Sequence, residues 1–314
     1  MPSFNVVNYS LRPSKSIQRQ LVFEGISKLK ASLDFERQVY IGFGSIWFTD
    51  FVLAHRLLGI DDMISIEANE VGYHRAVFNA PYATVRVLHG LSNEVLPTLY
   101  SDGSICTRPW LVWLDYDYHF DETRKEDIIS IIENSPPNSI LLVTFNGGEM
   151  KYGKAPDRPA RLRELFGAAV PDDLATNSCR DERMQQTLAD FALDLIQSTA
   201  SDLARPGGFI PAFRLIYQDN APMVTVGGIL PTKGAVTTAG GIVNNANWKC
   251  RPAKPIVAPP LTLRESAVLQ SCLPSVERLS RDAVRALGFD LEEDQIETFQ
   301  TYYRHCPTFV QILA

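Results

Sequence analysis

A glycine-containing turn near residue 42 is the feature that most constrains how this chain can fold. Residues 39–41 form an apolar run that ends at Gly42-Phe43-Gly44-Ser45, and a second apolar run ends at Glu67. This order predicts a buried strand, a tight turn, a helix and a second strand that ends in a carboxylate. Glu67 follows Gly44 by 67 − 44 = 23 residues, about where such folds place an acid that accepts hydrogen bonds from ribose hydroxyls. The pattern therefore predicts a site for an adenosine-containing cofactor.

Three further apolar runs, at residues 83–88, 110–115 and 139–145, predict the next strands, and residues 127–132 are helix-like. The runs at 110–115 and 139–145 are almost continuously apolar, which is typical of strands buried on both faces of a parallel sheet. Strands that alternate with helices in this way predict an α/β fold.

The strand order changes near the end of the predicted sheet. Residues 213–218 and 223–228 are both strand-like, and only residues 219–222 separate them. Because so short a link cannot hold a crossover helix, the two strands are expected to pair antiparallel as a hairpin. The predicted fold class is therefore α/β, with a Rossmann-like sheet of seven strands, of which five are parallel and two form the hairpin.

Over about residues 36–230 this arrangement resembles the class I S-adenosylmethionine-dependent methyltransferases. Gly42 and Gly44 match the two glycines of that family's first motif, and Glu67 matches its ribose-binding acid. Tyr40 stands where most members carry an acid that contacts the amino acid portion of the cofactor. The resemblance implies S-adenosylmethionine as the cofactor and methyl transfer as the reaction, so the chain is expected to be a transferase.

Residues 88–97 resemble a segment of small-molecule O-methyltransferases in which the residue after the third strand touches adenine. Here Leu91-Ser92 replaces the acidic residue that is usual at this place. The cofactor-binding residues that the resemblance implies are Gly42, Phe43, Gly44, Ser45, Glu67, Ala68, Ser92 and Asp115, with Tyr9 and Arg12 from a pre-sheet segment that folds over the cofactor.

The end of the fourth strand holds the densest cluster of candidate catalytic groups. Methyl transfer requires that the acceptor is held in line and that its proton, if it has one, is removed. Strand alternation predicts Asp115 and Asp117 on one side and Tyr116 and Tyr118 on the other. Either carboxylate is a candidate base, and His119 is a candidate general base near neutral pH. For Asp115 the alternative is a strand-end carboxylate that binds local backbone N–H groups.

A metal-assisted reaction remains an alternative. Metal-dependent O-methyltransferases use an acid at the fourth strand and an Asp-Asn pair after the fifth. In this chain Phe145-Asn146-Gly147 supplies the Asn without the acidic neighbour. Mg²⁺ is therefore kept as an alternative cofactor, and no metal ligand is assigned.

The residues at the end of the fourth strand bear on the nature of the methyl acceptor. Amino-group methyltransferases of nucleic acids usually carry an Asp/Asn-Pro-Pro-aromatic run there, and residues 115–118 contain no proline. The formal net charge of −6 gives no general electrostatic attraction for nucleic acid. The favoured prediction is O-methylation of a small molecule. The alternatives are a catalytically weak or inactive methyltransferase-fold scaffold in a multiprotein system, or a nucleic-acid methyltransferase.

Composition adds expectations about cellular context. The five cysteines show no CxxC spacing, which argues against a zinc cluster and against a disulfide framework. The N-terminus lacks a signal pattern, and no apolar run approaches the roughly 18 residues that span a bilayer. We expect a soluble, cytoplasmic protein without membrane association. A homodimer or a place in a protein complex stays open.

The predicted organisation has four parts. Residues 1–36 are expected to form an N-terminal helical cap with a helix over 17–33, near whose start Arg12, Lys15 and Arg19 form either an anion site or a solvated cap. Residues 37–234 are the predicted Rossmann domain, with a two-helix insertion at about 147–208 that is expected to cover the substrate cleft. Residues 235–260, rich in Gly, Asn, Thr and Pro, are predicted to be an irregular linker. Residues 261–314 are a predicted C-terminal helical module that opens with a Thr262–Glu265 capping box.

Overall fold

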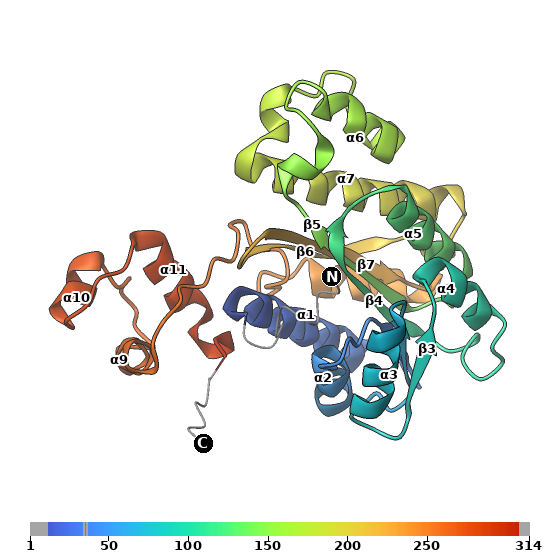
Figure 1. Cartoon of the computed structure of the whole chain (residues 1–314), viewed down its shortest axis with the longest axis horizontal. Coiled ribbons are helices and arrows are strands. Elements are labelled where there is room, and N and C mark those ends of the chain that lie inside the picture. Colours follow the sequence, from blue (N-terminus) through green and yellow to red (C-terminus); the bar gives the residue numbers. More distant parts are fainter. Residues whose placement is uncertain (1–11, 34, 36, 308–314) are drawn as a thin grey trace.

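The computed structural model describes residues 12–33, 35 and 37–307, and within them the strands form one seven-stranded sheet (Figure 1). Its strand order is β3-β2-β1-β4-β5-β7-β6. The first five strands pair parallel, whereas β7 pairs antiparallel with both β5 and β6. The predicted sheet and its terminal hairpin are therefore confirmed. The strands are β1 (Val39–Gly42), β2 (Met63–Glu67), β3 (Val85–His89), β4 (Trp110–His119), β5 (Ser139–Asn146), β6 (Ile210–Gln218) and β7 (Pro222–Leu230).

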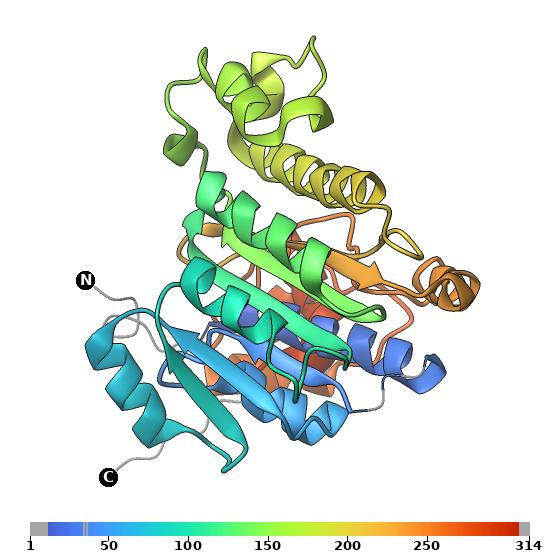
Figure 2. The ribbon, with the colours of Figure 1, turned by 90° about the vertical axis from the view of Figure 1, so that its right-hand side faces the viewer.

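Helices cover both faces of the sheet (Figure 2). One face packs against α1 (Pro13–Ser32), α2 (Thr49–Leu58), α3 (Glu70–Asn79) and α8 (Val236–Val243). The other face packs against α4 (Ser92–Tyr100), α5 (Glu122–Asn134) and α7 (Asp181–Asp202). Strand β4 shows why two cores form, because Val112 and Leu114 point into one and Leu111 and Trp113 into the other.

A buried chain of polar side chains fixes α1 on the sheet. The Trp113 indole N–H donates to Thr144 Oγ1 at 3.0 Å, and the hydroxyls of Thr144 and Thr225 lie 2.8 Å apart. The Gln18 amide of α1 in turn donates to Thr225 Oγ1 at 3.2 Å. Leaving one of these buried polar groups without a partner would be costly. This series of hydrogen bonds therefore favours a single position of α1 on the sheet, which apolar contacts alone would not specify.

Helix α1 begins four residues before the predicted start at 17, and its first turn explains the difference. Pro13 occupies the first helical position, where its missing N–H is not needed. Asp219, in the turn between β6 and β7, accepts hydrogen bonds from the backbone N–H groups of Ser14 (3.0 Å) and Lys15 (3.1 Å). The helix is therefore capped by a residue that is far away in the sequence.

The insertion between β5 and β6 forms the two predicted helices, α6 (Arg158–Phe166) and α7, with short 3₁₀ turns at Glu149–Tyr152, Gly167–Ala169 and Thr176–Cys179. Helix α7 lies across β6 and β7, and α6 packs on its outer side (Figure 1).

The stretch predicted as an irregular linker, 235–260, begins at the end of a 3₁₀ turn, Lys233–Ala235, and contains the helix α8. Ala239 and Val243, four residues apart on α8, are buried against the same core as α1. Farther on, Ile256 forms a β-bridge with Tyr217 and is fully buried. Composition does not predict these segments, because small residues suit close packing on the hairpin as well as they suit a loop.

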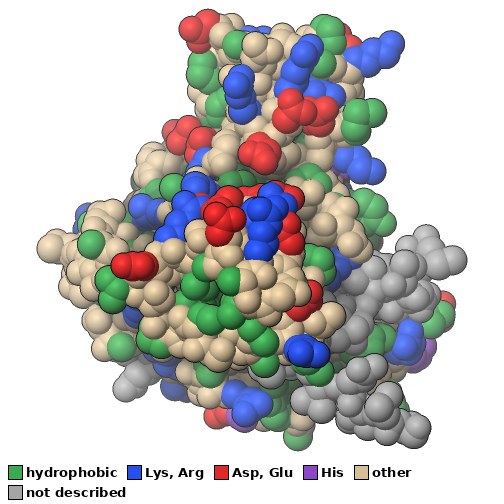
Figure 3. Space-filling model, turned by 90° about the vertical axis from the view of Figure 1, so that its left-hand side faces the viewer, with side chains coloured by type: hydrophobic (Ala, Val, Ile, Leu, Met, Phe, Trp, Pro, Cys, Tyr) green, Lys and Arg blue, Asp and Glu red, His purple; other side chains and the backbone are tan. Residues whose placement is uncertain are grey.

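The C-terminal module comprises α9 (Leu263–Ser271), α10 (Arg281–Ala286), α11 (Glu293–Tyr302) and a 3₁₀ turn, Tyr303–His305. The predicted capping box of Thr262 and Glu265 is present. The module has a small core of its own, and His305 Nε2 lies 2.7 Å from the carboxylate of Glu24 on α1. On this side of the molecule, acidic and basic side chains are interspersed above an apolar area (Figure 3).

Within the ranges that the structure describes, no helix is both long and apolar enough to cross a membrane.

Candidate cofactor and methyl-transfer site

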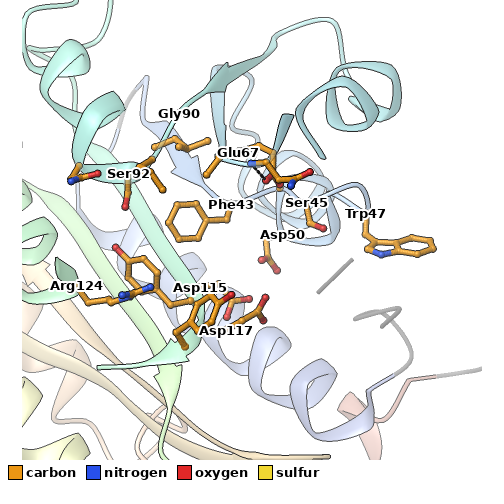
Figure 4. A pocket seen from close by; sticks show the side chains of 18 of the residues that line it. Phe43, Ser45, Trp47, Asp50, Glu67, Gly90, Ser92, Asp115, Asp117 and Arg124 are labelled. Atoms are coloured by element: carbon orange, nitrogen blue, oxygen red, sulfur yellow. Dashed lines mark hydrogen bonds between the residues drawn. The ribbon is translucent and has the colours of Figure 1, made fainter. Parts of the chain in front are cut away.

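A cavity of about 730 Å³ lies at the carboxyl ends of β1, β2, β3 and β4 (Figure 4). This edge of an open α/β sheet is where such folds bind ligands. The cavity is lined by the turn after β1, the residues that follow β2 and β3, the last part of β4, the first two turns of α1 and the first turns of α2 and α5. Figure 4 shows Phe43 near the middle of these side chains, with Ser92 on one side and Trp47 on the far side.

The glycine turn is shaped by the protein itself. A Cβ atom on Gly44 would lie 2.5 Å from the ring of Phe48, and one on Gly42 would lie 2.9 Å from the carbonyl oxygen of Trp113. Both glycines are therefore needed for packing, whether or not a ligand is bound. Ser45 follows in the left-handed region (φ 51°) and lines the cavity. Its buried hydroxyl has no hydrogen-bond partner among the described residues, so a polar ligand group would satisfy it.

Glu67 ends β2 and lines the cavity beside Ala68. One of its carboxylate oxygens accepts a hydrogen bond from the backbone N–H of Asn69 at 2.9 Å. Burial raises the pKa of Glu67, and the nearby charge of Asp117 raises it further. A carboxylate that is partly desolvated at a cavity wall is suited to accept hydrogen bonds from a ligand.

Two buried ion pairs join α1 to the floor of the cavity. The Lys15 ammonium lies 2.5 Å from Asp115 Oδ2, and the Arg19 guanidinium pairs with the carboxylate of Asp50. All four side chains line the cavity. Burial lowers the pKa of Arg19, but the carboxylates of Asp50 and Asp115 more than offset this, so its pKa lies above the ordinary value. The four charges balance, which is what burial of ions requires.

Tyr40 reaches the same charge cluster from β1. Burial and the neighbouring Asp50 carboxylate raise the pKa of Tyr40 well above its ordinary value, so this side chain is neutral. The sequence lacks an acid at position 40, yet the structure brings the carboxylate of Asp50 close to it from the first turn of α2. Asp50 was not singled out in the sequence, because an acid in the first turn of a helix is ordinary.

The outer part of the cavity is more exposed and more aromatic. Asp117 and Tyr118 line it with mostly exposed side chains. The Arg124 guanidinium lies over the rings of Tyr116 (5.2 Å) and Tyr118 (5.5 Å). Trp47 also lines the cavity and is 41% exposed.

Other predicted site residues lie elsewhere. His119 does not line the cavity, and its ring packs edge-on against Tyr152 at 5.8 Å. Arg12 precedes α1 at the N-cap position and is also not part of the lining. Tyr9 lies outside the described residues. No residue of the insertion, 147–208, lines the cavity, because α7 lies over the distant strands β6 and β7. The expectation that the insertion covers the cleft is therefore wrong.

The residues present do not fit a Mg²⁺ ion. Asp115, the acid at the fourth strand, is paired with an ammonium group, and Asn146 Oδ1 accepts a hydrogen bond from the backbone N–H of Gly148 at 2.8 Å. Among the residues described here, no group of three or more His, Cys, Asp or Glu side chains is arranged to hold a metal ion.

The parallel sheet with its terminal hairpin, and a cavity with a glycine turn and a carboxylate after β2, define the fold of the class I S-adenosylmethionine-dependent methyltransferases. Residues 7–314 match the family described as "Putative O-methyltransferase", so the chain belongs to that family and is a methyltransferase. No curated protein matches the sequence.

Similar solved structures include an O-methyltransferase from Bacillus cereus in complex with SAH, at 14% identity over 72% of this chain and 84% of that chain, with a TM-score of 0.41. Trm1 from Pyrococcus horikoshii with S-adenosyl-L-methionine is 12% identical over 71% of this chain and 57% of that chain, with a TM-score of 0.47. The O-methyltransferase TomG from Streptomyces achromogenes, in complex with SAM, is 16% identical over 71% and 90%, with a TM-score of 0.39.

Proposed function

We propose that this methyltransferase transfers a methyl group from S-adenosylmethionine to an oxygen atom of a small molecule. The observation that carries the proposal is the Lys15–Asp115 ion pair, which lies in the same cavity as the glycine turn and Glu67. An ammonium group at that place can donate a hydrogen bond to an acceptor oxygen and stabilise the negative charge that this oxygen gains when its proton is removed.

The polar groups of the cavity fit the cofactor at both ends. In this proposal Glu67 accepts hydrogen bonds from the ribose hydroxyls. Arg19 and Asp50 face the methionine end, where a carboxylate and an ammonium group match their opposite charges. The unpartnered hydroxyl of Ser45 supplies a further hydrogen bond there. Ser92 contacts the adenine at the other end. When bound, S-adenosylmethionine supplies an electrophilic methyl group on a sulfonium, whose sulfur leaves as a neutral thioether.

The acceptor side needs one donor, one proton acceptor and a means of alignment. We assign the donor to Lys15, whose ammonium orients the acceptor oxygen, and Asp115 holds that ammonium in place. We assign proton removal to Asp117, which is exposed at the cavity and can pass the proton to solvent. His119 receives no step because its ring lies outside the cavity.

A small acceptor is favoured over a nucleic acid by size and charge. The cavity volume of about 730 Å³ lies in the upper part of the range for small-molecule sites, roughly 300–1,000 Å³, so it can hold a cofactor and a modest acceptor together. The formal net charge of −6 gives no general electrostatic attraction for nucleic acid.

The test has two stages. Calorimetric titration with S-adenosylmethionine and S-adenosylhomocysteine should show micromolar binding of both. The protein is then incubated with methyl-labelled cofactor and panels of phenols, alcohols, amines and short RNAs, and products are identified by mass spectrometry. Label on an oxygen of a small molecule supports the proposal. Binding without transfer favours an inactive scaffold, label on a nitrogen or an RNA contradicts the acceptor class, and no binding refutes the proposal.

A further inference from the structure

A buried carboxylate lies directly behind the adenine end of the cavity. Asp127 of α5 is 2% exposed, and its Oδ2 atom accepts two hydrogen bonds of 2.5 Å, one from the hydroxyl of Ser92 and one from the hydroxyl of Tyr116. Ser92 and Tyr116 both line the cavity, whereas Asp127 does not. Three elements, α4, β4 and α5, thus meet at one carboxylate oxygen.

The directions of these two hydrogen bonds follow from the number of protons available. Burial and the charge of Asp127 raise the pKa of Tyr116 well above its ordinary value, so this phenol keeps its proton and donates it. A carboxylate can only accept. Ser92 has a single hydroxyl proton, and that proton is also directed at Asp127. The Ser92 oxygen, which also lies close to the Tyr116 hydroxyl, therefore has only lone pairs left for other partners, and it can bind only a ligand group that donates a hydrogen bond.

We propose that Asp127 determines the nucleobase specificity of the cofactor site by acting through Ser92. Because the Ser92 hydroxyl donates its proton to Asp127, the Ser92 oxygen accepts a hydrogen bond from an exocyclic amino group, such as that of adenine. It rejects a base that carries a carbonyl oxygen at the same place, because two acceptors would then face each other. Asp127 is a positioning residue in this scheme. The proposal rests on the proposed function, since it assumes that an S-adenosyl ligand binds here.

The charge on Asp127 is what distinguishes this role from a purely structural one. Holding α4, α5 and β4 together does not require an ion, and well-packed apolar side chains often replace buried charges without loss of stability. Fixing the direction of a hydroxyl proton does require an acceptor that cannot also donate. The two roles therefore predict different behaviour when Asp127 is replaced by an apolar residue of similar size.

The experiment compares binding of S-adenosylhomocysteine with that of S-inosylhomocysteine, in which hypoxanthine replaces adenine, by calorimetry on the full chain. Wild type should prefer the adenine ligand by roughly ten- to hundredfold. Asp127→Leu and Ser92→Ala should each bring that ratio close to one. Tyr116→Phe is the matched control, because it removes the other hydrogen bond to the same oxygen and should retain the preference whatever the absolute affinity.

Each of the remaining outcomes overturns either this proposal or the proposed function on which it rests. A wild-type ratio near one, or an unchanged ratio in folded Asp127→Leu, overturns the proposal. If the melting curve shows that Asp127→Leu does not fold, Ser92→Ala alone decides, and a preference retained in that variant overturns the proposal as well. Failure of wild type to bind either ligand is distinguishable from these outcomes, since it refutes the proposed function and this inference with it.

Discussion

Asp115→Asn is the most informative single change, because it removes one charge from a balanced buried group of four. Wild type carries Lys15 and Arg19 against Asp50 and Asp115, and the side chains of the Lys15–Asp115 pair are only 4% and 12% exposed. Breaking a buried ion pair on one side typically costs about 3–5 kcal/mol, since the remaining charge has lost its compensation. We expect the free energy of unfolding to fall by about 3 kcal/mol, because the cavity lets water reach part of the site.

Lys15→Met should lower the free energy of unfolding less than Asp115→Asn does. The double variant should lose less stability than the sum of the two single losses. In Lys15→Met the carboxylate of Asp115 keeps the nearby Arg19 guanidinium, whose pKa responds to Asp115. In Lys15→Met/Asp115→Asn the remaining Arg19 and Asp50 balance again. The double variant should therefore be more stable than Asp115→Asn, with a coupling energy of about 1–3 kcal/mol in the double-mutant cycle. Asp190→Asn is the matched control, because Asp190 pairs with Arg214 but its side chain is 55% exposed, and it should change stability by less than about 1 kcal/mol.

Turnover separates this positioning role from a purely structural one. If Lys15 contacts the acceptor oxygen, Asp115→Asn should lower kcat roughly 10²-fold per folded molecule, while cofactor affinity changes little because the adenosine is held from the Glu67 side. The assay combines urea unfolding, titration with S-adenosylhomocysteine and single-turnover methyl transfer. Additive stability effects in the cycle, or full turnover in folded Asp115→Asn, would refute the reasoning.

Three further predictions concern the cofactor wall and the docking of α1. Glu67→Gln should weaken S-adenosylhomocysteine binding by about 1.5–3 kcal/mol. Burial raises the pKa of Glu67, and only its ionised form accepts hydrogen bonds from both ribose hydroxyls, so wild-type affinity should fall as the pH drops through that raised pKa. Glu67→Gln should abolish this pH dependence. Identical pH profiles of wild type and Glu67→Gln by calorimetry would contradict the assignment. Gly44→Ala should lower the melting temperature as well as cofactor affinity, since its Cβ would lie 2.5 Å from the Phe48 ring; an unchanged melting temperature would show that the turn relaxes freely. Asp219→Ala should cost about 1 kcal/mol through loss of the α1 cap and also lower turnover, whereas the cap variant Thr262→Ala should cost a similar amount with turnover unchanged; equal turnover in both variants would detach α1 from the reaction.

The fold could be predicted because its signals are local. Apolar runs such as 110–115 and 139–145 predict buried strands wherever they occur, and the four residues 219–222 leave only a hairpin as the connection. The helix α8 was missed because its burial comes from contact with the hairpin and α1, which no local pattern encodes.

The ion pairs of the site could not be predicted in the same way. Lys15 and Asp115 are 100 residues apart, and their pairing depends on how α1 docks through the Gln18–Thr225 hydrogen bond and the Asp219 cap. One signal was present, since Lys15 and Arg19 are four residues apart and so share a helix face with the apolar Val22 and Ile26. The pattern predicted an anion site or a solvated cap for these cations, and the structure pairs each of them with a carboxylate instead.

Asp50 and Asp127 offer one explanation for both departures from the family pattern, at Tyr40 and at Leu91-Ser92. The strands lack an acid at Tyr40 and after β3, where Leu91-Ser92 stands, and in both places a carboxylate lies close by on a helix. Asp50 of α2 accompanies Tyr40, and Asp127 of α5 acts through Ser92. A carboxylate acts on a ligand through its charge and its distance, so a helix that packs against the strand can supply it as well as the strand itself. If Asp50→Asn and Asp127→Leu weaken the methionine and adenine contacts selectively, the missing motif residues are relocated rather than lost.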